Sequence, residues 1–170
     1  AAAGLYLNSP SGIWEYSVEG YYKRMSDYLD YRGGAKLLMN HHIETDVINT
    51  QGHAYGVELQ VKKQVGKLNG WMSYTYSRTF LRQNDKRIEK PVNNGDWYPT
   101  EYDKPHDFKF VGNYKFTHRY SMSINVDYST GRPTTIPAGQ YYDESTQSMR
   151  VYYTERNSYR IPDYFRTDIS

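Results

Sequence analysis

The stretch "GKLNGWMSYTYSRTF", Gly66–Phe80, decides the fold because large apolar and small polar side chains alternate along it. Met72, Tyr74 and Tyr76 are separated by Ser73, Thr75 and Ser77. Alternation with a period of two predicts a β-strand that has one apolar face and one polar face. Such a strand needs either a protein core or lipid against its apolar face, and the rest of the chain decides between them.

The other segments of the chain alternate in the same way, and none keeps the i, i+3, i+4, i+7 spacing of an amphipathic helix through two turns. They are Gly4–Leu7, Trp14–Tyr22 with an extension to about Tyr31, Tyr55–Lys63, Phe108–Phe116, Met122–Ser129 and a last segment from Tyr159 to Ile169. The predicted fold class is therefore all-β, an antiparallel up-and-down meander of about seven strands.

The connections between these segments alternate in length. Residues 8–12, 65–69 and 117–120 form short turns, whereas residues 32–52, 84–104 and 135–158 form long connections. Transmembrane β-barrels have short periplasmic turns and long outer loops, and a soluble meander has no reason for this alternation. The pattern predicts part of a transmembrane β-barrel in which the aromatic side of each strand faces lipid, with Trp71 in an aromatic girdle.

The composition agrees with a membrane interface. The 170 residues include 20 Tyr, an amphipathic residue that is favoured where one end is dry and the other wet. The chain has no apolar run long enough for a spanning helix and no Cys for a disulfide or thiolate metal site. Its net charge is only +2, and its basic residues are dispersed, which excludes an electrostatic footprint for nucleic acid.

Six consecutive segments resemble the barrel of TonB-dependent outer-membrane receptors of the Bacteroidetes type. They are "VEGYYKRMSDYLDY", "GHAYGVELQVKK", "GKLNGWMSYTYSRT", "YDKPHDFKFVGNYKF", "YSMSINVDYSTGRPTTIP" and "RNSYRIPDYFRTDIS", within residues 18–170. The resemblance implies a bacterial outer-membrane barrel of about 22 strands, filled by a plug. It also implies a TonB-type energising complex and import of a siderophore, cobalamin or glycan. Residues 1–170 are expected to form a single β-barrel segment without the plug domain or a TonB box.

The long connections carry the aromatic residues that are the candidates for ligand contact. They are Trp97, Tyr98, Tyr141, Tyr142, Tyr152 and Tyr153. The alternative role for each is packing within the loops or in the aromatic girdle that such barrels carry at the outer interface.

Two polar clusters contain residue types found in metal sites or in catalytic sites, and neither predicts a metal, a cofactor or an enzyme. His41 and His42, near Glu44 and Asp46, offer metal-ligand types, but adjacent side chains in an extended loop point to opposite sides. The stretch "YDKPHDF", residues 102–108, holds Asp103, His106 and Asp107 without a nucleophile or an enclosed site. There, Pro105 is expected to set the strand entry and Asp107 to face the lumen.

Two other architectures remain open at this point. A soluble β-sandwich or lipocalin-like domain would use the tyrosine-rich face to hold a ligand. A complete eight-stranded outer-membrane barrel would need one strand more than the pattern shows.

Overall fold

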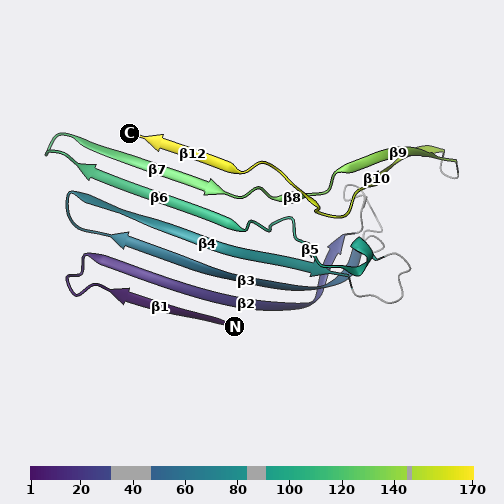
Figure 1. Cartoon of the computed structure of the whole chain (residues 1–170), viewed down its shortest axis with the longest axis horizontal. Coiled ribbons are helices and arrows are strands. Elements are labelled where there is room, and N and C mark those ends of the chain that lie inside the picture. Colours follow the sequence, from purple (N-terminus) through teal and green to yellow (C-terminus); the bar gives the residue numbers. More distant parts are fainter. Residues whose placement is uncertain (32–46, 84–90, 145–146) are drawn as a thin grey trace.

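A computed structural model describes residues 1–31, 47–83, 91–144 and 147–170. Its main sheet is a long, open, antiparallel meander (Figure 1). In spatial order the sheet holds β1 (Ala2–Asn8), β2 (Trp14–Tyr31), β3 (Val47–Lys63), β4 (Leu68–Arg82), β6 (His106–Lys115), β7 (Ser121–Ser129) and β12 (Tyr164–Ile169). The predicted meander of about seven strands is confirmed.

Smaller elements gather at the long-loop end of the sheet. β5 (Tyr98–Pro99) pairs with the end of β4 after a 3₁₀ turn at Val92–Gly95. Two further pairs are β8 (Pro133–Thr134) with β11 (Tyr159–Arg160), and β9 (Pro137–Asp143) with β10 (Ser148–Tyr153). The connection at residues 135–158 therefore contains a projecting hairpin, β9–β10, which the sequence pattern did not predict (Figure 1).

The first long connection is shorter than predicted, because β3 begins at Val47 and not at Tyr55. Ile48 and Thr50 are buried on one side of this extension. The polar residues Asn49, Thr50 and Gln51 hide the alternation there. Pairing with residues 28–31 of β2, together with burial, and not local alternation, makes this stretch a strand.

The strand register places most of the apolar side chains of the seven strands on one face. One row across the sheet runs Leu5, Val18, Leu59, Tyr74, Phe108, Tyr128, Phe165. The neighbouring row on the opposite face includes Glu19, Glu58, Thr75, Asp107 and Ser129. The sorting of faces and the position of Asp107 on the polar face are confirmed.

Trp71 is the exception to the predicted sorting. It pairs with Lys62 and Val111, so it lies on the polar face and not in an apolar girdle. The alternation from Met72 onward already gives Trp71 the opposite parity. An aromatic side chain alone therefore does not show which face of the sheet Trp71 occupies.

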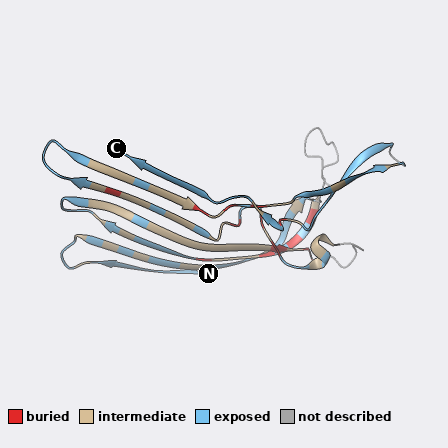
Figure 2. Cartoon of the chain, turned by 45° about the horizontal axis from the view of Figure 1, so that its top comes forward, coloured by how far each residue is buried: buried red, intermediate tan, exposed pale blue. Residues whose placement is uncertain are grey.

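The main sheet has no hydrophobic core of its own. Among the described residues, the only buried hydrophobic side chains are those of Ile48, Leu81 and Tyr98. They lie at the long-loop end, where the buried residues in Figure 2 gather. On the apolar face, Leu59 is 41% exposed and Phe165 is 67% exposed. A soluble sandwich would cover this face with a second sheet, and the described elements leave it open.

Both edges of the main sheet are open in the described part of the chain. β1 pairs only with β2, and β12 pairs only with β7. The sheet does not close on itself, so it is not a complete eight-stranded barrel. No helix in the described ranges is long and apolar enough to cross a membrane.

Gly70 is required where β4 passes β6. Its φ is +153°, and a Cβ there would lie 2.0 Å from the Val111 carbonyl oxygen. Gly70→Ala is expected to lower the free energy of unfolding by more than about 1 kcal/mol, because backbone and not a flexible side chain must move. Urea titration of the protein folded in detergent micelles measures the loss.

Gly20→Ala is the matched control for this substitution. A Cβ at Gly20 would meet its nearest neighbour, the Gly56 carbonyl oxygen, at 3.9 Å, an ordinary contact. Equal stability losses for the Gly70 and Gly20 variants would contradict the assigned steric role of Gly70.

Candidate functional site

The site is built around a segment that continues the sheet between β5 and β6. The Thr100 N–H donates to the Thr79 carbonyl (3.0 Å), and the Ser77 N–H donates to the Pro105 carbonyl (3.1 Å). Between these two bonds, the Thr79 N–H donates to the Asp103 carboxylate (2.8 Å). A buried backbone N–H needs a hydrogen-bond acceptor, and here the Asp103 side chain takes the place of a carbonyl of a neighbouring strand.

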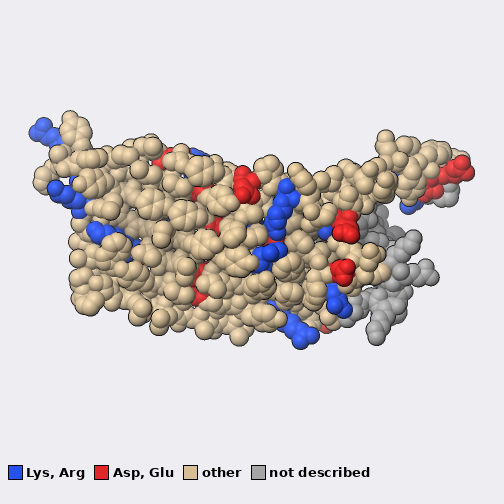
Figure 3. All heavy atoms as spheres, in the orientation of Figure 1, with Lys and Arg blue, Asp and Glu red and all other residues tan. Residues whose placement is uncertain are grey.

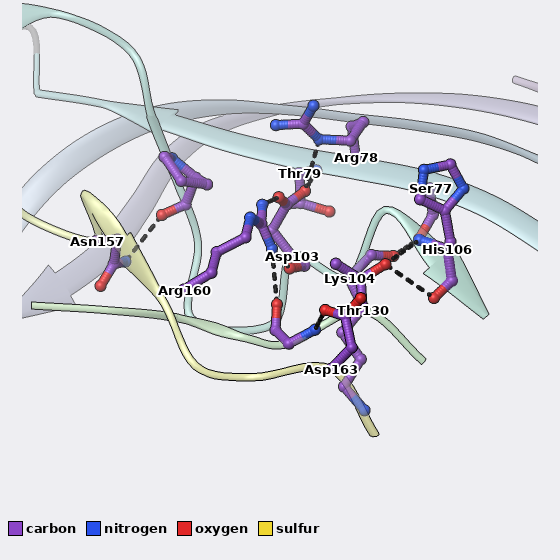
Figure 4. Close-up of polar contacts among 12 residues, drawn as sticks. Ser77, Arg78, Thr79, Asp103, Lys104, His106, Thr130, Asn157, Arg160 and Asp163 are labelled. Carbon is purple, nitrogen blue, oxygen red and sulfur yellow. Dashed lines mark hydrogen bonds and ion pairs between the residues drawn. The ribbon is translucent and has the colours of Figure 1, made fainter. Parts of the chain in front are cut away.

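Asp103 joins three parts of the chain. Its side chain is fully buried, and its carboxylate accepts a hydrogen bond from Arg78 Nε at 3.2 Å. The Arg160 guanidinium from β11 contacts the same carboxylate and also donates to the Asp103 carbonyl (2.7 Å) and the Gly131 carbonyl (2.9 Å). Figure 4 shows Arg160 reaching Asp103 beside β4. We call Asp103, Arg78 and Arg160 the Asp103 cluster.

A second junction lies beside the Asp103 cluster. Arg156 contacts the Asp30 carboxylate at 2.9 Å, and the Tyr98 hydroxyl donates to the other Asp30 oxygen at 2.9 Å. Asn157 donates to the Pro99 carbonyl at 2.8 Å. Burial, reinforced by the negative charge of Asp30, raises the pKa of the Tyr98 hydroxyl well above its usual range. Tyr98 therefore stays a hydrogen-bond donor across the physiological range of pH.

These junctions frame a cavity of about 660 Å³ at the long-loop end. It lies on the polar side of the sheet, because Leu81, which lines it, has the same parity along β4 as Thr75. Its lining combines tyrosine rings with charged and amide groups: Tyr28, Tyr31, Tyr98, Tyr102, Tyr153, Asp30, Glu101, Arg156, Asn93 and Asn157. A concave site of this size with aromatic walls and a few fixed polar groups suits a small polar molecule.

The structure divides the six predicted aromatic residues among three places. Tyr98 and Tyr153 line the cavity, although Tyr98 is only 1% exposed and its hydroxyl is held by Asp30. Tyr141, Tyr142 and Tyr152 lie on the β9–β10 hairpin, each more than half exposed and outside the cavity lining.

Trp97 lies on the apolar side of the sheet. Its ring meets the His53 ring edge-on at 4.4 Å between centroids, and Arg82 lies 5.7 Å from its ring centroid. His53 also packs against Phe80, which belongs to the apolar face. Trp97 therefore lies outside the cavity lining, on the opposite side of the sheet.

Of the two polar clusters considered from the sequence, only the one at residues 102–108 lies within the described residues. His41, His42, Glu44 and Asp46 lie outside the described residues. Within the described ranges no group of three or more His, Asp or Glu residues could hold a metal ion.

The structure does not bring Asp103, His106 and Asp107 together as an acid–base set. Asp103 is engaged in its cluster, and Asp107 lies on the polar face. The Nδ1 atom of His106 lies 2.8 Å from the Tyr74 hydroxyl, on the apolar side. Three different environments thus hold the three side chains.

Sequence reasoning missed the residues that frame the cavity, namely Asp30, Asn93, Arg156 and Asn157. Asp30 and Arg156 are 126 positions apart, and Asn93 accepts the Arg156 N–H at 2.7 Å across 63 positions. Each is a single polar residue without a local motif. Nothing in the spacing of the sequence marks them as partners.

Comparison with known families agrees with the architecture. The TonB dependent receptor-like beta-barrel family matches residues 3–170, nearly the whole chain. No curated protein and no solved structure matches it. Members of this family are outer-membrane transporters that depend on TonB for energy. The chain, with its one apolar face and its long-loop end, belongs to the TonB-dependent receptor β-barrel family of the bacterial outer membrane.

Proposed function

We propose that this chain forms part of the wall of a receptor that binds a nutrient ligand and imports it through a TonB-type complex. The ligand is of the siderophore, cobalamin or glycan class, and the receptor is of the Bacteroidetes type. The observation that carries the proposal is the cavity of about 660 Å³ on the polar, lumenal side at the long-loop end. Long loops are extracellular in such barrels, so the cavity faces incoming ligand.

Residues 1–170 act as one barrel segment in this proposal. The free edges of β1 and β12 carry backbone groups that lipid cannot satisfy, so further strands pair with both edges. A plug fills the lumen against the polar face, where Glu58, Asp107 and Lys109 offer partners of both signs. The apolar face then meets outer-membrane lipid.

Among the three ligand classes, the cavity chemistry favours a glycan. Exposed tyrosine rings provide flat apolar surface for sugar rings, and carboxylate, amide and guanidinium groups bond to hydroxyls. Asp30, Glu101 and Arg156 leave the lining with no excess of positive charge for an anionic chelate.

Tyr153→Ala is expected to weaken ligand binding about three- to tenfold, the effect of losing one aromatic stacking partner. Calorimetric titration of the receptor, extracted from outer membranes, with an oligosaccharide series, a ferric siderophore and cobalamin makes the measurement. Tyr142→Ala, on the same hairpin but outside the cavity lining, is the control. Binding that is unchanged in the Tyr153 variant, or reduced equally in both, contradicts the assigned site.

A further inference from the structure

A smaller cavity adjoins the cavity of about 660 Å³ at the long-loop end. It measures about 370 Å³ and is lined by Glu101, residues 132–135, Asn157 and Ile161. Three of these residues, Glu101, Thr135 and Asn157, also line the larger cavity. The two cavities are therefore neighbours with a common boundary. We call the larger one the first chamber and the smaller one the second chamber.

The boundary between the chambers is held in place by Asn157. The Asn157 N–H donates to the Thr135 hydroxyl (3.0 Å), and this hydroxyl donates to Asn157 Oδ1 (3.3 Å). The Asn157 amide donates to the Pro99 carbonyl (2.8 Å). Asn157 is buried, and its φ is +55°, a left-handed conformation that asparagine adopts more readily than most residues. These contacts fix the boundary before a ligand arrives, and such preorganisation favours binding.

Glu101 is the exposed part of the boundary. It lines both chambers, so a ligand that passes Glu101 extends from one chamber into the other. Among the residues that the structure describes, none forms an ion pair or hydrogen bond with the Glu101 carboxylate. The carboxylate is therefore available to accept hydrogen bonds from a ligand in either chamber.

The second chamber carries two opposite charges that do not pair with each other. Arg132 lines it together with Glu101, and the Arg132 guanidinium likewise has no partner within the described ranges. A guanidinium only donates hydrogen bonds and a carboxylate only accepts them, so the two together match hydroxyl groups, which do both. Pro133 and Ile161 add apolar surface for the C–H face of a sugar ring. Figure 3 shows acidic and basic side chains interspersed toward the long-loop end, which suits an uncharged ligand.

The second chamber extends beyond the reach of a single sugar ring at the boundary. Arg132 precedes Thr135 by three positions, and the residues between them form the extended strand β8, so the two Cα atoms are about 10 Å apart. This span is longer than one sugar ring. A ring that contacts Thr135 therefore leaves Arg132 to the next ring of the same chain.

We propose that the two chambers form one elongated site for an oligosaccharide, with one sugar unit held in the second chamber by Arg132 and Glu101. This inference rests on the proposed import of a glycan and adds to it a second subsite and a preference for linked sugars. The neighbouring units of the chain lie in the first chamber among its tyrosine rings. Binding therefore strengthens with chain length until the second chamber is filled.

Arg132→Ala is expected to weaken the binding of long oligosaccharides about three- to tenfold, the net effect of losing one hydrogen bond, and to leave the shortest oligomer that binds unaffected. Calorimetric titration of the receptor, extracted from outer membranes, with α- and β-linked hexose oligomers from monomer to hexamer makes the measurement. Arg119→Ala, which removes an exposed arginine at the short-turn end, is the matched control. An equal loss for short and long oligomers, or no loss beyond that of the Arg119 variant, overturns the proposal.

Glu101→Ala is expected to give a contrasting dependence on length. Because Glu101 lines both chambers, its loss weakens the binding of short and long oligomers alike. The same length dependence in the Glu101 and Arg132 variants would show that the second chamber is not a separate subsite. If no oligomer binds the unchanged receptor, the glycan assignment itself is wrong, a result distinct from failure of the second chamber. Heat-modifiable migration on a gel shows that each variant is folded.

Discussion

Asp103→Asn is expected to lower the free energy of unfolding by about 3–5 kcal/mol, the cost of removing one partner from a buried ion pair. The carboxylate has no exposed surface and faces two guanidiniums, from Arg78 and Arg160. The amide keeps the size of the side chain and can still accept the Thr79 N–H. It leaves both arginines without a counter-charge, and Arg160 is then free to leave β4 together with β8 and β11.

Urea titration in detergent micelles measures this loss, and limited proteolysis between β8 and β11 reports whether the segment has come away. Asp107→Asn is the matched control, because Asp107 is part-exposed on the polar face and its ion pair with Lys109 is 3.7 Å long. Exposed ion pairs contribute little. A loss below about 1 kcal/mol for Asp103→Asn, similar to that of the control, would show that the cluster does not hold the long-loop end.

Leu59→Arg is expected to destabilise the folded protein in a bilayer by about 2–4 kcal/mol, as a cation on the lipid-facing side of a barrel does near the midplane. Leu59 lies in the middle of the apolar row between Val18 and Tyr74. Reversible folding into phospholipid vesicles, followed by tryptophan fluorescence in a urea series, gives the free energy.

The adjacent residue supplies the control for this test. Gln60 lies on the polar face, between Ser17 and Ser73, so Gln60→Arg places the same cation in the lumen. Its effect is expected to stay below about 1 kcal/mol, as for a typical surface substitution. A reversed order, with Gln60→Arg the more damaging, would mean that the polar side of the sheet faces lipid or a protein core.

The seven strands and their two faces could be predicted because alternation is a local property. The alternation within β4 alone assigns Met72, Tyr74 and Tyr76 to one face. Pairing with the neighbouring strands places these residues beside apolar residues of the same face and does not change the assignment. The prediction was wrong for Trp71, which was assigned to the apolar side because it is aromatic although its position in the alternation belongs to the polar face. The prediction also missed the first residues of β3, Val47–Gln51, where the side chains do not alternate between apolar and polar.

The candidate site could be predicted only as a region. The alternating lengths of the connections indicate which end bears the ligand-binding loops, and two of the six predicted aromatic residues line the cavity there. The same reasoning could not separate Tyr153 from Trp97, which the structure places on the apolar side against His53. A loop carries no periodicity from which the direction of a side chain can be read.

The sequence by itself determined the strands and their apolar and polar faces, which follow from patterns within about ten residues. It also determined the membrane setting, which follows from the alternating lengths of the connections. Only the tertiary structure decided how Asp103 meets Arg160 across 57 positions and how Asp30 meets Arg156 across 126. These contacts depend on loop closure and on the order of the strands. The sequence does not show whether a charged residue will be buried in an ion pair or left exposed, because its partner comes from a distant part of the chain.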